Sequence, residues 1–303
     1  MTSATEVTPR EETIESGGMN LFVRSWQPKG TTRGIVVLCH GFNSHSGYYT
    51  SVGEQLAARG FAAYALDLRG RGQSDGERFY VEKMSDWVNN VADAVTLAKS
   101  RHTALPTYLL GHSAGGVISC LYCQEHQDEL SGFICESFAF QVPAPDFAIA
   151  VLKGLSHLAP HAHVLRLKNE DFSRDPAVVE RMNQDPLIAH ETQPTHTVAE
   201  LARADERLKR EFGQITLPLL ILHGTADKAT KPSGSQQFYD TAASKDKTLK
   251  FYEGHYHDLL NDLGREAVLA EIVQWIEAHA AAAAAERRFT VPAAKSLDER
   301  PMA

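Results

Sequence analysis

The stretch Gly111-His112-Ser113-Ala114-Gly115-Gly116 decides how the rest of the sequence is interpreted. It has the form G-x-S-x-G, and a short β-prone run, residues 107–110, precedes it. An apolar run, residues 117–123, follows it and is typical of the start of a buried helix. A strand, a sharp glycine-lined turn and a helix would place the serine at a strained apex, with the helix N-terminus directed at its Oγ. The glycines are needed because side chains there would collide with the neighbouring strand and helix.

The composition is that of an ordinary globular enzyme, with 43% hydrophobic and 22% charged residues in a chain of 303. The net charge of −8 argues against nucleic acid as a partner, since binding to phosphate requires a basic face. No stretch approaches the roughly 20 consecutive apolar residues of a membrane span. Residues 1–15 lack the charged-then-apolar order of a signal peptide. We therefore expect a cytoplasmic protein.

Buried strands and helices alternate along most of the chain. The candidate strands are short apolar runs rich in β-branched residues, which is typical of strands covered on both faces. Amphipathic helical segments lie between them. The alternation predicts an α/β fold with a mostly parallel sheet and helices on both faces. An early antiparallel strand is expected over 20–26, and the other expected strands are 34–39, 61–66, 107–110, 132–135, 217–222 and 247–252.

The alternation is interrupted between residues 138 and 212, where helical segments follow one another without strands. This predicts a helical cap (lid) at 138–212, inserted into a core made of 19–137 and 213–279. Residues 1–18 are expected to form a flexible leader. The alanine-rich and charged segment 280–303 is expected to form a flexible C-terminal tail.

Loops after later strands supply the groups that a serine nucleophile needs. A base must lie within hydrogen-bond reach of Ser113, and a carboxylate must hold that base in the right tautomer. Asp227 follows the last but one of the expected strands, and both His255 and His257 follow the last. The chain order serine, acid, histidine is the order of an α/β-hydrolase. Glu136, at the end of strand 132–135, is a second candidate for the acid; otherwise it is expected to line the pocket or to pair with a basic group.

An oxyanion hole requires two backbone N–H donors directed at the developing negative charge. The amide of Ala114, directly after the candidate nucleophile, is one expected donor. The amide of Phe42, in the loop after strand 34–39, is the other, because His40-Gly41 can bend the chain toward the serine. Metal chemistry is not expected. The pairs 161/163 and 255/257 are histidines, but no cysteine or carboxylate stands at a matching spacing.

With these motifs in place, the sequence resembles the monoglyceride lipase and lysophospholipase branch of the α/β-hydrolases, also described as serine aminopeptidase-like hydrolases. The matching motifs extend from about residue 20 to residue 279 and include part of the cap. The resemblance implies an α/β-hydrolase fold with the helical cap inserted after the sixth strand. The matching pieces are His40-Gly41, residues 45–49, residues 67–74, Gly111-His112-Ser113, residues 183–187, residues 223–227 and Tyr256-His257.

The resemblance also implies roles. Ser113 would be the nucleophile, Asp227 the orienting acid and His257, rather than His255, the base. The implied activity is hydrolysis of carboxylic esters with an apolar acyl group, through an acyl-enzyme and without metal or organic cofactor. Alternatives on the same residues are lysophospholipase, thioesterase and amidase or peptidase activity. A non-catalytic ligand-binding relative is an alternative from another class. The partner would be a small-molecule ester or lipid.

Departures from the family pattern fall at positions that help hold the alcohol end of the substrate. Family members that act on monoglycerides usually carry an acidic residue at the position of Ser44 and an arginine at that of Tyr48. Some carry a histidine where this chain has Leu260. Ala114 stands where methionine is common, which would widen the pocket. Ser44, Tyr48, Leu260 and Glu136 are candidates for the substrate pocket.

The candidate cap helix over 147–158 is apolar on almost every side. Phe147, Val151 and Leu155 are further candidates for the pocket. The helix is expected either to be buried against the core or to be a lid that meets an acyl chain or a membrane surface. In the second case the protein would be peripheral at a membrane, with transient contact through the cap. The sequence leaves the oligomeric state open.

Overall fold

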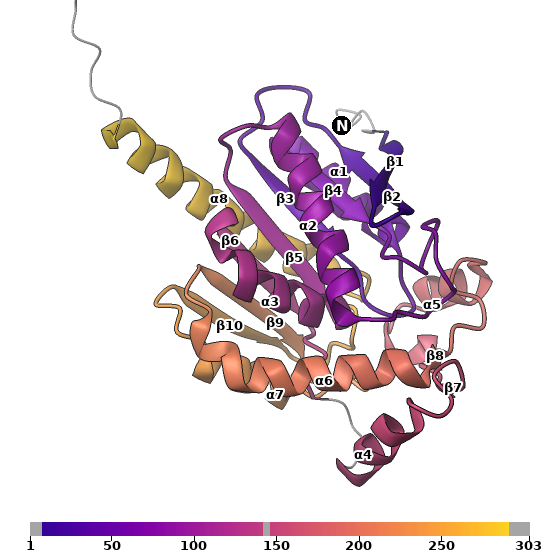
Figure 1. Ribbon diagram of the computed structural model, residues 1–303. Helices are drawn as coiled ribbons and strands as arrows, with labels where there is room; N and C mark the ends of the chain where they lie inside the picture. Colours follow the sequence, from indigo (N-terminus) through magenta and orange to yellow (C-terminus); the bar gives the residue numbers. More distant parts are fainter. Residues whose placement is uncertain (1–7, 142–145, 291–303) are drawn as a thin grey trace, which may run out of the picture.

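The computed structural model describes residues 8–141 and 146–290. Its centre is an eight-stranded sheet of order β1-β2-β4-β3-β5-β6-β9-β10 (Figure 1). The pairs β1–β2 and β2–β4 are antiparallel, and the other neighbours are parallel. The sequence prediction of a mostly parallel sheet is confirmed. The strands are β1 (Arg10–Ser16), β2 (Met19–Trp26), β3 (Gly34–Cys39), β4 (Phe61–Leu66), β5 (Thr107–His112), β6 (Gly132–Glu136), β9 (Leu219–Gly224) and β10 (Lys247–Tyr252).

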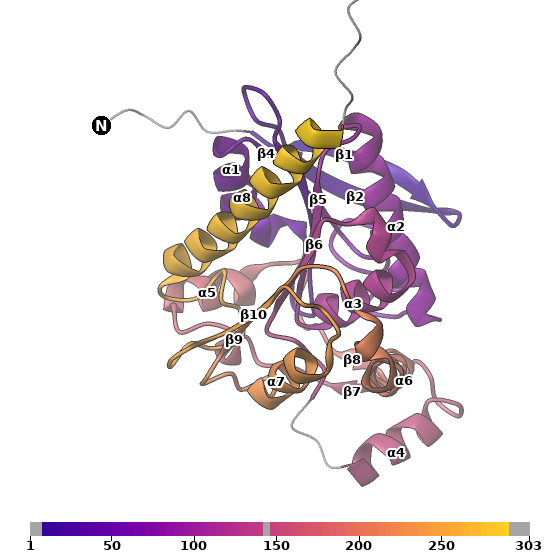
Figure 2. The same cartoon turned by 90° about the vertical axis from the view of Figure 1, so that its left-hand side faces the viewer.

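Helices cover both faces of the sheet. Figure 2 shows α1 and α8 on one side and α2 and α3 on the other. Successive residues of a buried strand therefore enter different cores: Val36 packs with α1 and α8, whereas Val37 packs with α2 and α3. The helices are α1 (Thr50–Ala58), α2 (Met84–Arg101), α3 (Ala114–His126), α7 (Pro232–Thr241) and α8 (Arg265–Thr290), with short 3₁₀ turns η1 (Ser46–Tyr49) and η2 (Gln127–Glu129).

The expected flexible leader is corrected in part, because β1 lies inside it. The strand pairs with β2 along its whole length, and the turn Gly17-Gly18 joins them with both residues at positive φ. A Gly-Gly pair between two strands is a hairpin signal that the sequence reading missed. The strand itself is hard to recognise, because charged residues fill the exposed side of this edge strand. Residues 1–7 of the expected leader lie outside the described residues.

The expected flexible tail is also corrected in part. Helix α8 continues through the alanine run to Thr290, well beyond residue 279. Alanine has the highest intrinsic helix propensity, so the run prolongs the helix that precedes it. Residues 291–303 lie outside the described residues. Within the described ranges, no helix is both long enough and apolar enough to cross a bilayer.

The segment between β6 and β9, which we call the insertion, is mostly helical and contains one small two-stranded sheet. In Figure 2 its helix α4 lies at the edge of the molecule, away from the large sheet. Helix α6 packs against both α4 and α3 and so joins the insertion to the core. Its elements are α4 (Asp146–Leu155), β7 (His163–Leu165), η3 (Asn169–Asp171), α5 (Pro176–Gln184), β8 (Gln193–Pro194), α6 (Thr195–Glu211) and η4 (Phe212–Gln214).

A buried ion pair ties the insertion to the loop after β4. Arg71 is fully buried and pairs with Glu191 of the insertion, which is equally buried. Arg71 Nη2 also donates a hydrogen bond of 2.7 Å to Gln193 Oε1. The guanidinium lies 4.4 Å from the centroid of the Phe42 ring. Since a lone buried charge is costly, each member of the pair depends on the other.

We expect Arg71→Met to lower the free energy of unfolding by about 3–5 kcal/mol, because it leaves the Glu191 carboxylate buried and unpaired. Arg10→Met, at an exposed ion pair with Glu12, is the control and should change it by no more than about 0.5 kcal/mol. Urea unfolding at neutral pH measures both. A stability of Arg71→Met equal to that of the unchanged protein would contradict the assignment.

Candidate active site

Ser113 lies in the turn between β5 and α3, with φ 56° and ψ −121°. A non-glycine residue in this region of backbone space is strained and persists only where its surroundings hold it. The packing explains the glycines that the sequence analysis singled out. A Cβ on Gly111 would lie 2.6 Å from the Gly115 carbonyl oxygen, and a Cβ on Gly115 would lie 2.3 Å from that of Cys39. The expected strand, tight turn and helix are all present around the serine.

The structure brings Ser113, Asp227 and His257 together. His257 Nε2 lies 2.8 Å from Ser113 Oγ, and His257 Nδ1 lies 2.7 Å from Asp227 Oδ2. The three residues come from loops that follow β5, β9 and β10, whose carboxyl ends share one edge of the sheet. The side chains of Asp227 and His257 are fully buried. His255 lies elsewhere: its Nδ1 is 3.8 Å from Asp262, and its ring packs on Tyr252.

Asp227 is surrounded by groups that favour its ionised form. Its Oδ1 accepts backbone N–H bonds from Ala229 and Thr230, and its Oδ2 also lies 3.0 Å from His223 Nε2. Burial opposes ionisation, but the two histidines outweigh it and hold the pKa of Asp227 far below its usual range. An ionised Asp227 holds the proton of His257 on Nδ1 and leaves Nε2 free to accept from Ser113.

Sequence reasoning missed two supports of this arrangement. His223, the fourth residue before Asp227, is the last residue but one of β9 and contacts the carboxylate. Its own Nδ1 lies 2.7 Å from Ser235 Oγ. The i, i+4 spacing at a strand end was the available signal. Phe172 of the insertion packs edge-on against His257, with ring centroids 4.9 Å apart. No signal in the sequence linked this phenylalanine to the histidine.

The loop after β3 passes very close to the serine. A Cβ on Gly41 would lie 2.8 Å from Ser113 Cβ and 2.9 Å from the His112 carbonyl oxygen, so only glycine fits there. Phe42 and Ala114 both line the cavity that contains Ser113. The two expected oxyanion-hole residues therefore lie beside the serine, Phe42 in the loop after β3 and Ala114 at the start of α3.

Of the three roles expected for Glu136, the structure contradicts those of acid for His257 and pocket residue and shows the third, pairing with a basic group. Its Oε1 accepts the Leu259 N–H at 2.7 Å, and its Oε2 lies 2.9 Å from His112 Nδ1, at an angle that makes an ion pair rather than a hydrogen bond. It is fully buried beneath the site and does not line the cavity. Strand β6 lies beside β5, and this pairing places Glu136 opposite His112.

His112, Glu136 and Asp258 form a buried cluster of titratable groups with ligand atoms within 4.8 Å of one another. Burial lowers the pKa of His112, but the carboxylates of Glu136 and Asp258 outweigh it and raise the pKa to about 9. Burial, above all, raises the pKa of Asp258. Because His112 faces Glu136 directly at 2.9 Å, we interpret the cluster as a buried imidazolium held between carboxyl groups.

The cavity at Ser113 has a volume of about 370 Å³, within the range of small-molecule sites. Most of its lining residues are apolar, and Ser113 and His257 are among the others. Its remaining walls come mainly from the insertion. The apolar lining residues are Phe42, Ala114, Ala139, Ala148, Ile149, Leu152, Val164, Leu165, Leu167, Phe172, Val198, Leu201, Ala202 and Ala229.

The expected pocket residues do not line this cavity. Helix α4 lines the cavity with Ala148, Ile149 and Leu152. The three residues of this helix that were predicted to line it lie on its other sides. Ser44 and Tyr48 are buried and do not line the cavity, and Tyr48 donates a hydrogen bond of 3.0 Å to Asp185 Oδ2 of the insertion. The prediction was wrong for Ser44, Tyr48, Glu136, Phe147, Val151, Leu155 and Leu260; of these, Phe147, Val151 and Leu155 are exposed, and Leu260 belongs to the core on the α8 side.

Comparison with known proteins agrees with the fold. Residues 30–264 match the family described as serine aminopeptidase, S33. A monoacylglycerol lipase of Mycolicibacterium smegmatis is 35% identical over 267 residues, which cover 87% of this chain and 95% of that protein. A monoglyceride lipase of Rattus norvegicus is 33% identical over 277 residues, covering 90% and 91%. The crystal structure of a Paleococcus ferrophilus monoacylglycerol lipase superimposes with a TM-score of 0.77 at 30% identity, covering 86% and 99%.

The fold and the site therefore define an α/β-hydrolase, and the comparisons support a serine ester hydrolase. The chain belongs to the serine aminopeptidase S33 family. The resemblance identified from the sequence motifs is confirmed.

The buried cluster predicts how stability depends on pH. His112 has a folded-state pKa of about 9 against an ordinary value of 6.5. Its stabilising contribution is therefore complete below pH 6.5 and is lost as the pH rises toward 9. We expect the free energy of unfolding to fall over this interval by on the order of 1–3 kcal/mol. Urea unfolding across the interval measures the fall.

Glu136→Gln provides the comparison, because it removes one of the carboxylates that raise the pKa of His112. The fall in stability should be smaller in this variant. The same fall in both proteins would show that another group is responsible.

Proposed function

We propose that this protein hydrolyses carboxylic esters of apolar acyl groups, with Ser113 as nucleophile, His257 as base and Asp227 as orienting acid. The observation that carries the proposal is the chain of two short hydrogen bonds through His257, which opens onto an apolar cavity. A hydroxyl bonded to an unprotonated imidazole nitrogen can be deprotonated as it attacks. The surrounding apolar walls suit an acyl chain.

The reaction follows from this geometry. Ser113 Oγ attacks the ester carbonyl while His257 takes the hydroxyl proton, and the amides of Phe42 and Ala114 stabilise the oxyanion. His257 then gives the proton to the departing alcohol, which leaves an acyl-serine. Water enters, loses a proton to His257 and attacks the acyl carbon. The proton returns to Ser113 Oγ as the carboxylic acid is released.

The relatives point to a monoacylglycerol as the ester, since the proteins with 35% and 33% identity are described as monoacylglycerol and monoglyceride lipases. Lysophospholipids, thioesters and amides would use the same residues, because a triad does not select the leaving group. A panel of these compounds, compared by kcat/KM, distinguishes the candidates. Tight retention of one ligand without turnover would instead favour the non-catalytic alternative.

Replacement of the triad provides the direct test. Ser113→Ala and Asp227→Asn should each lower kcat for a monoacylglycerol by about 10⁴-fold or more, the second because His257 then adopts the wrong tautomer. A serine-reactive fluorophosphonate should label the unchanged protein and not Ser113→Ala. Glu136→Gln is the matched control, since this carboxyl group is not bonded to His257, and it should retain activity within about tenfold. Full activity in Asp227→Asn would overturn the assignment of the acid.

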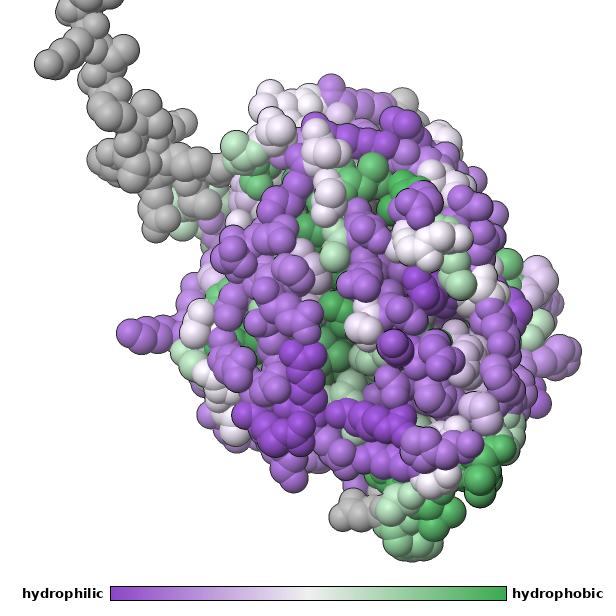
Figure 3. Space-filling view, viewed as in Figure 1, coloured by the Kyte–Doolittle hydropathy of each residue, from purple (hydrophilic) through white to green (hydrophobic). Residues whose placement is uncertain are grey.

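We also propose that the insertion is a cap and that helix α4 contacts membrane surfaces. The face of α4 turned away from the cavity is apolar and exposed, with Phe147 74% and Val151 66% accessible, and Leu158 just beyond the helix 86% accessible. Figure 3 shows apolar side chains gathered at the end of the molecule where α4 lies in Figure 1. An exposed apolar patch of this kind is typical of an interaction surface. The cytoplasm is the proposed compartment.

Replacing exposed apolar side chains tests this contact. Phe147→Ser with Leu158→Ser should weaken sedimentation with phosphatidylcholine vesicles, because less apolar area enters the interface. Hydrolysis of a short soluble ester should be unaffected. Phe251→Ser, at an exposed phenylalanine on the far strand β10, is the control and should sediment like the unchanged protein. Equal vesicle binding by all three proteins would contradict the contact.

A further inference from the structure

A carboxyl group interrupts the apolar stripe that helix α6 contributes to the wall of the active-site cavity. Helix α6 lines the cavity with Val198, Leu201 and Ala202, and the next position on the same face is Asp205. This spacing of three and four residues is that of one side of a helix. An apolar residue would complete the stripe at this position, and the chain has an acid there.

The Asp205 carboxyl lacks a partner among the described residues. Its Oδ1 is out of contact with solvent and accepts no hydrogen bond from them. Lys153, the cation that acts on the pKa of Asp205, pairs with Glu206. Burial, and then the charge of Glu206, raise the pKa of Asp205 well above its ordinary value, and Lys153 opposes this only in part. A buried acceptor without a donor is energetically unfavourable, so a donor supplied by a ligand would be favoured there.

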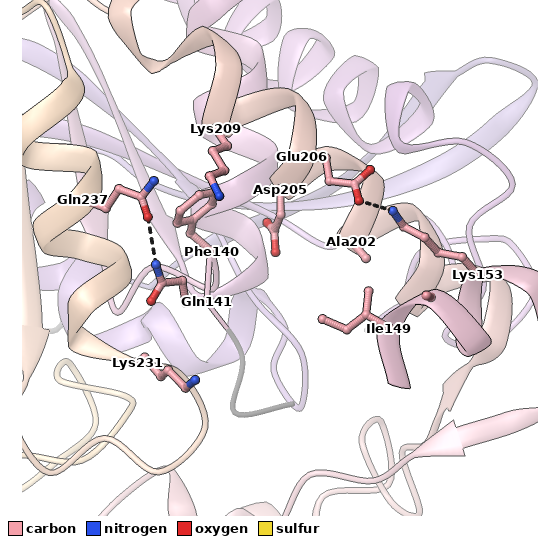
Figure 4. A pocket seen from close by; sticks show the side chains of 11 residues that line it. Phe140, Gln141, Ile149, Lys153, Ala202, Asp205, Glu206, Lys209, Lys231 and Gln237 are labelled. Atoms are coloured by element: carbon pink, nitrogen blue, oxygen red, sulfur yellow. Dashed lines mark hydrogen bonds and ion pairs between the residues drawn. The ribbon is translucent and has the colours of Figure 1, made fainter. Parts of the chain in front are cut away.

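Asp205 also borders a second pocket, of about 440 Å³. This pocket shares Ile149, Ala202 and Asp205 with the first, so these side chains stand between the two. Figure 4 shows Asp205 projecting from α6 toward the space between Gln141 and Ile149. The other walls are largely polar and include Gln141, Lys153, Glu206, Lys209, Lys231 and Gln237.

We propose that Asp205 is a specificity-determining residue that binds a hydroxyl group on the acyl chain of the substrate. The preferred substrates would be esters of hydroxylated fatty acids, whose chain lies along the apolar cavity from Ser113 and whose hydroxyl meets Asp205. This inference rests on the proposed ester hydrolase function and names its substrate class.

A hydroxyl fits this position better than a charged group. It both donates and accepts a hydrogen bond, so it pairs with either protonation state of the carboxyl. A carboxylate on the chain would face the acidic side chains of Asp205 and Glu206. An ammonium group would have to lose its hydration in the apolar cavity, at much greater cost than a hydroxyl.

The test compares matched nitrophenyl esters of one saturated chain length, one without a hydroxyl and the others with the hydroxyl at successive carbons. For the unchanged protein, kcat/KM should be about 10- to 100-fold higher for the best hydroxylated ester than for the plain one. Asp205→Leu should abolish this ratio by improving the plain ester and weakening the hydroxylated one. Asp205→Asn, which keeps the shape and an acceptor oxygen, should retain part of it.

Two controls separate the causes of a negative result. The acetate ester, too short to extend along the cavity, should be cleaved equally by the unchanged protein and the Asp205 variants. Asp171→Leu alters another acid of the same cavity, one that lies 4.0 Å from Lys228, and should leave the hydroxyl ratio unchanged. A ratio near one in the unchanged protein, or the same ratio in Asp205→Leu, would overturn the proposal.

Binding gives a readout that does not require turnover. Calorimetry with Ser113→Ala should show tighter binding of the free hydroxylated acid than of the plain acid, and Ser113→Ala with Asp205→Leu should bind both alike. If this difference appears while the unchanged protein cleaves no ester, the proposed hydrolase function fails and the hydroxyl site stands. If esters are cleaved without any hydroxyl preference in rate or binding, the hydroxyl site fails and the hydrolase function stands.

Discussion

The hydrogen bond between Ser113 and His257 joins side chains 144 residues apart, and much of the fold holds it in place. Parallel strands carry both loops to one edge of the sheet, where the groups can meet. The two backbone amides that follow His257 are held as well, one by the carbonyl of Phe172 in the insertion and the other by the Glu136 carboxylate at the end of β6. The imidazole is therefore positioned by the protein itself, before any substrate binds.

Three buried charges near this site have partners of opposite charge. Asp227 has two histidines, His112 has carboxyl groups, and Arg71 has a glutamate of the insertion. Removing one partner of such a pair is far more damaging than the net contribution of the pair suggests, because the remaining charge stays buried. These contacts link the loops after β4, β5 and β6 to the insertion and to the loop that carries His257. Stability and the geometry of the site thus depend on the same interactions.

The insertion controls what reaches the serine. It supplies most of the cavity wall, while its α4 turns its other face outward. The strands and the turn at Ser113 provide the chemistry, which is common to many hydrolases. Selectivity for the acyl group depends on side chains of α4 and α6, among which Asp205 is the polar exception. Selectivity for the alcohol group does not follow from Ser44 and Tyr48 as expected, since both are buried and neither lines the cavity.

The sequence by itself determined the alternating strands, the insertion and the chain order of Ser113, Asp227 and His257, because these are encoded in local patterns: apolar runs, turn glycines and polar groups that follow strands. Only the tertiary structure decided which face of α4 meets the cavity. A helix that is apolar on almost every side carries no periodic signal for its buried face. The tertiary structure also decided the pairing of Glu136 with His112 and the isolation of Asp205. Both depend on which neighbours packing brings to a carboxyl group, and no local pattern records that.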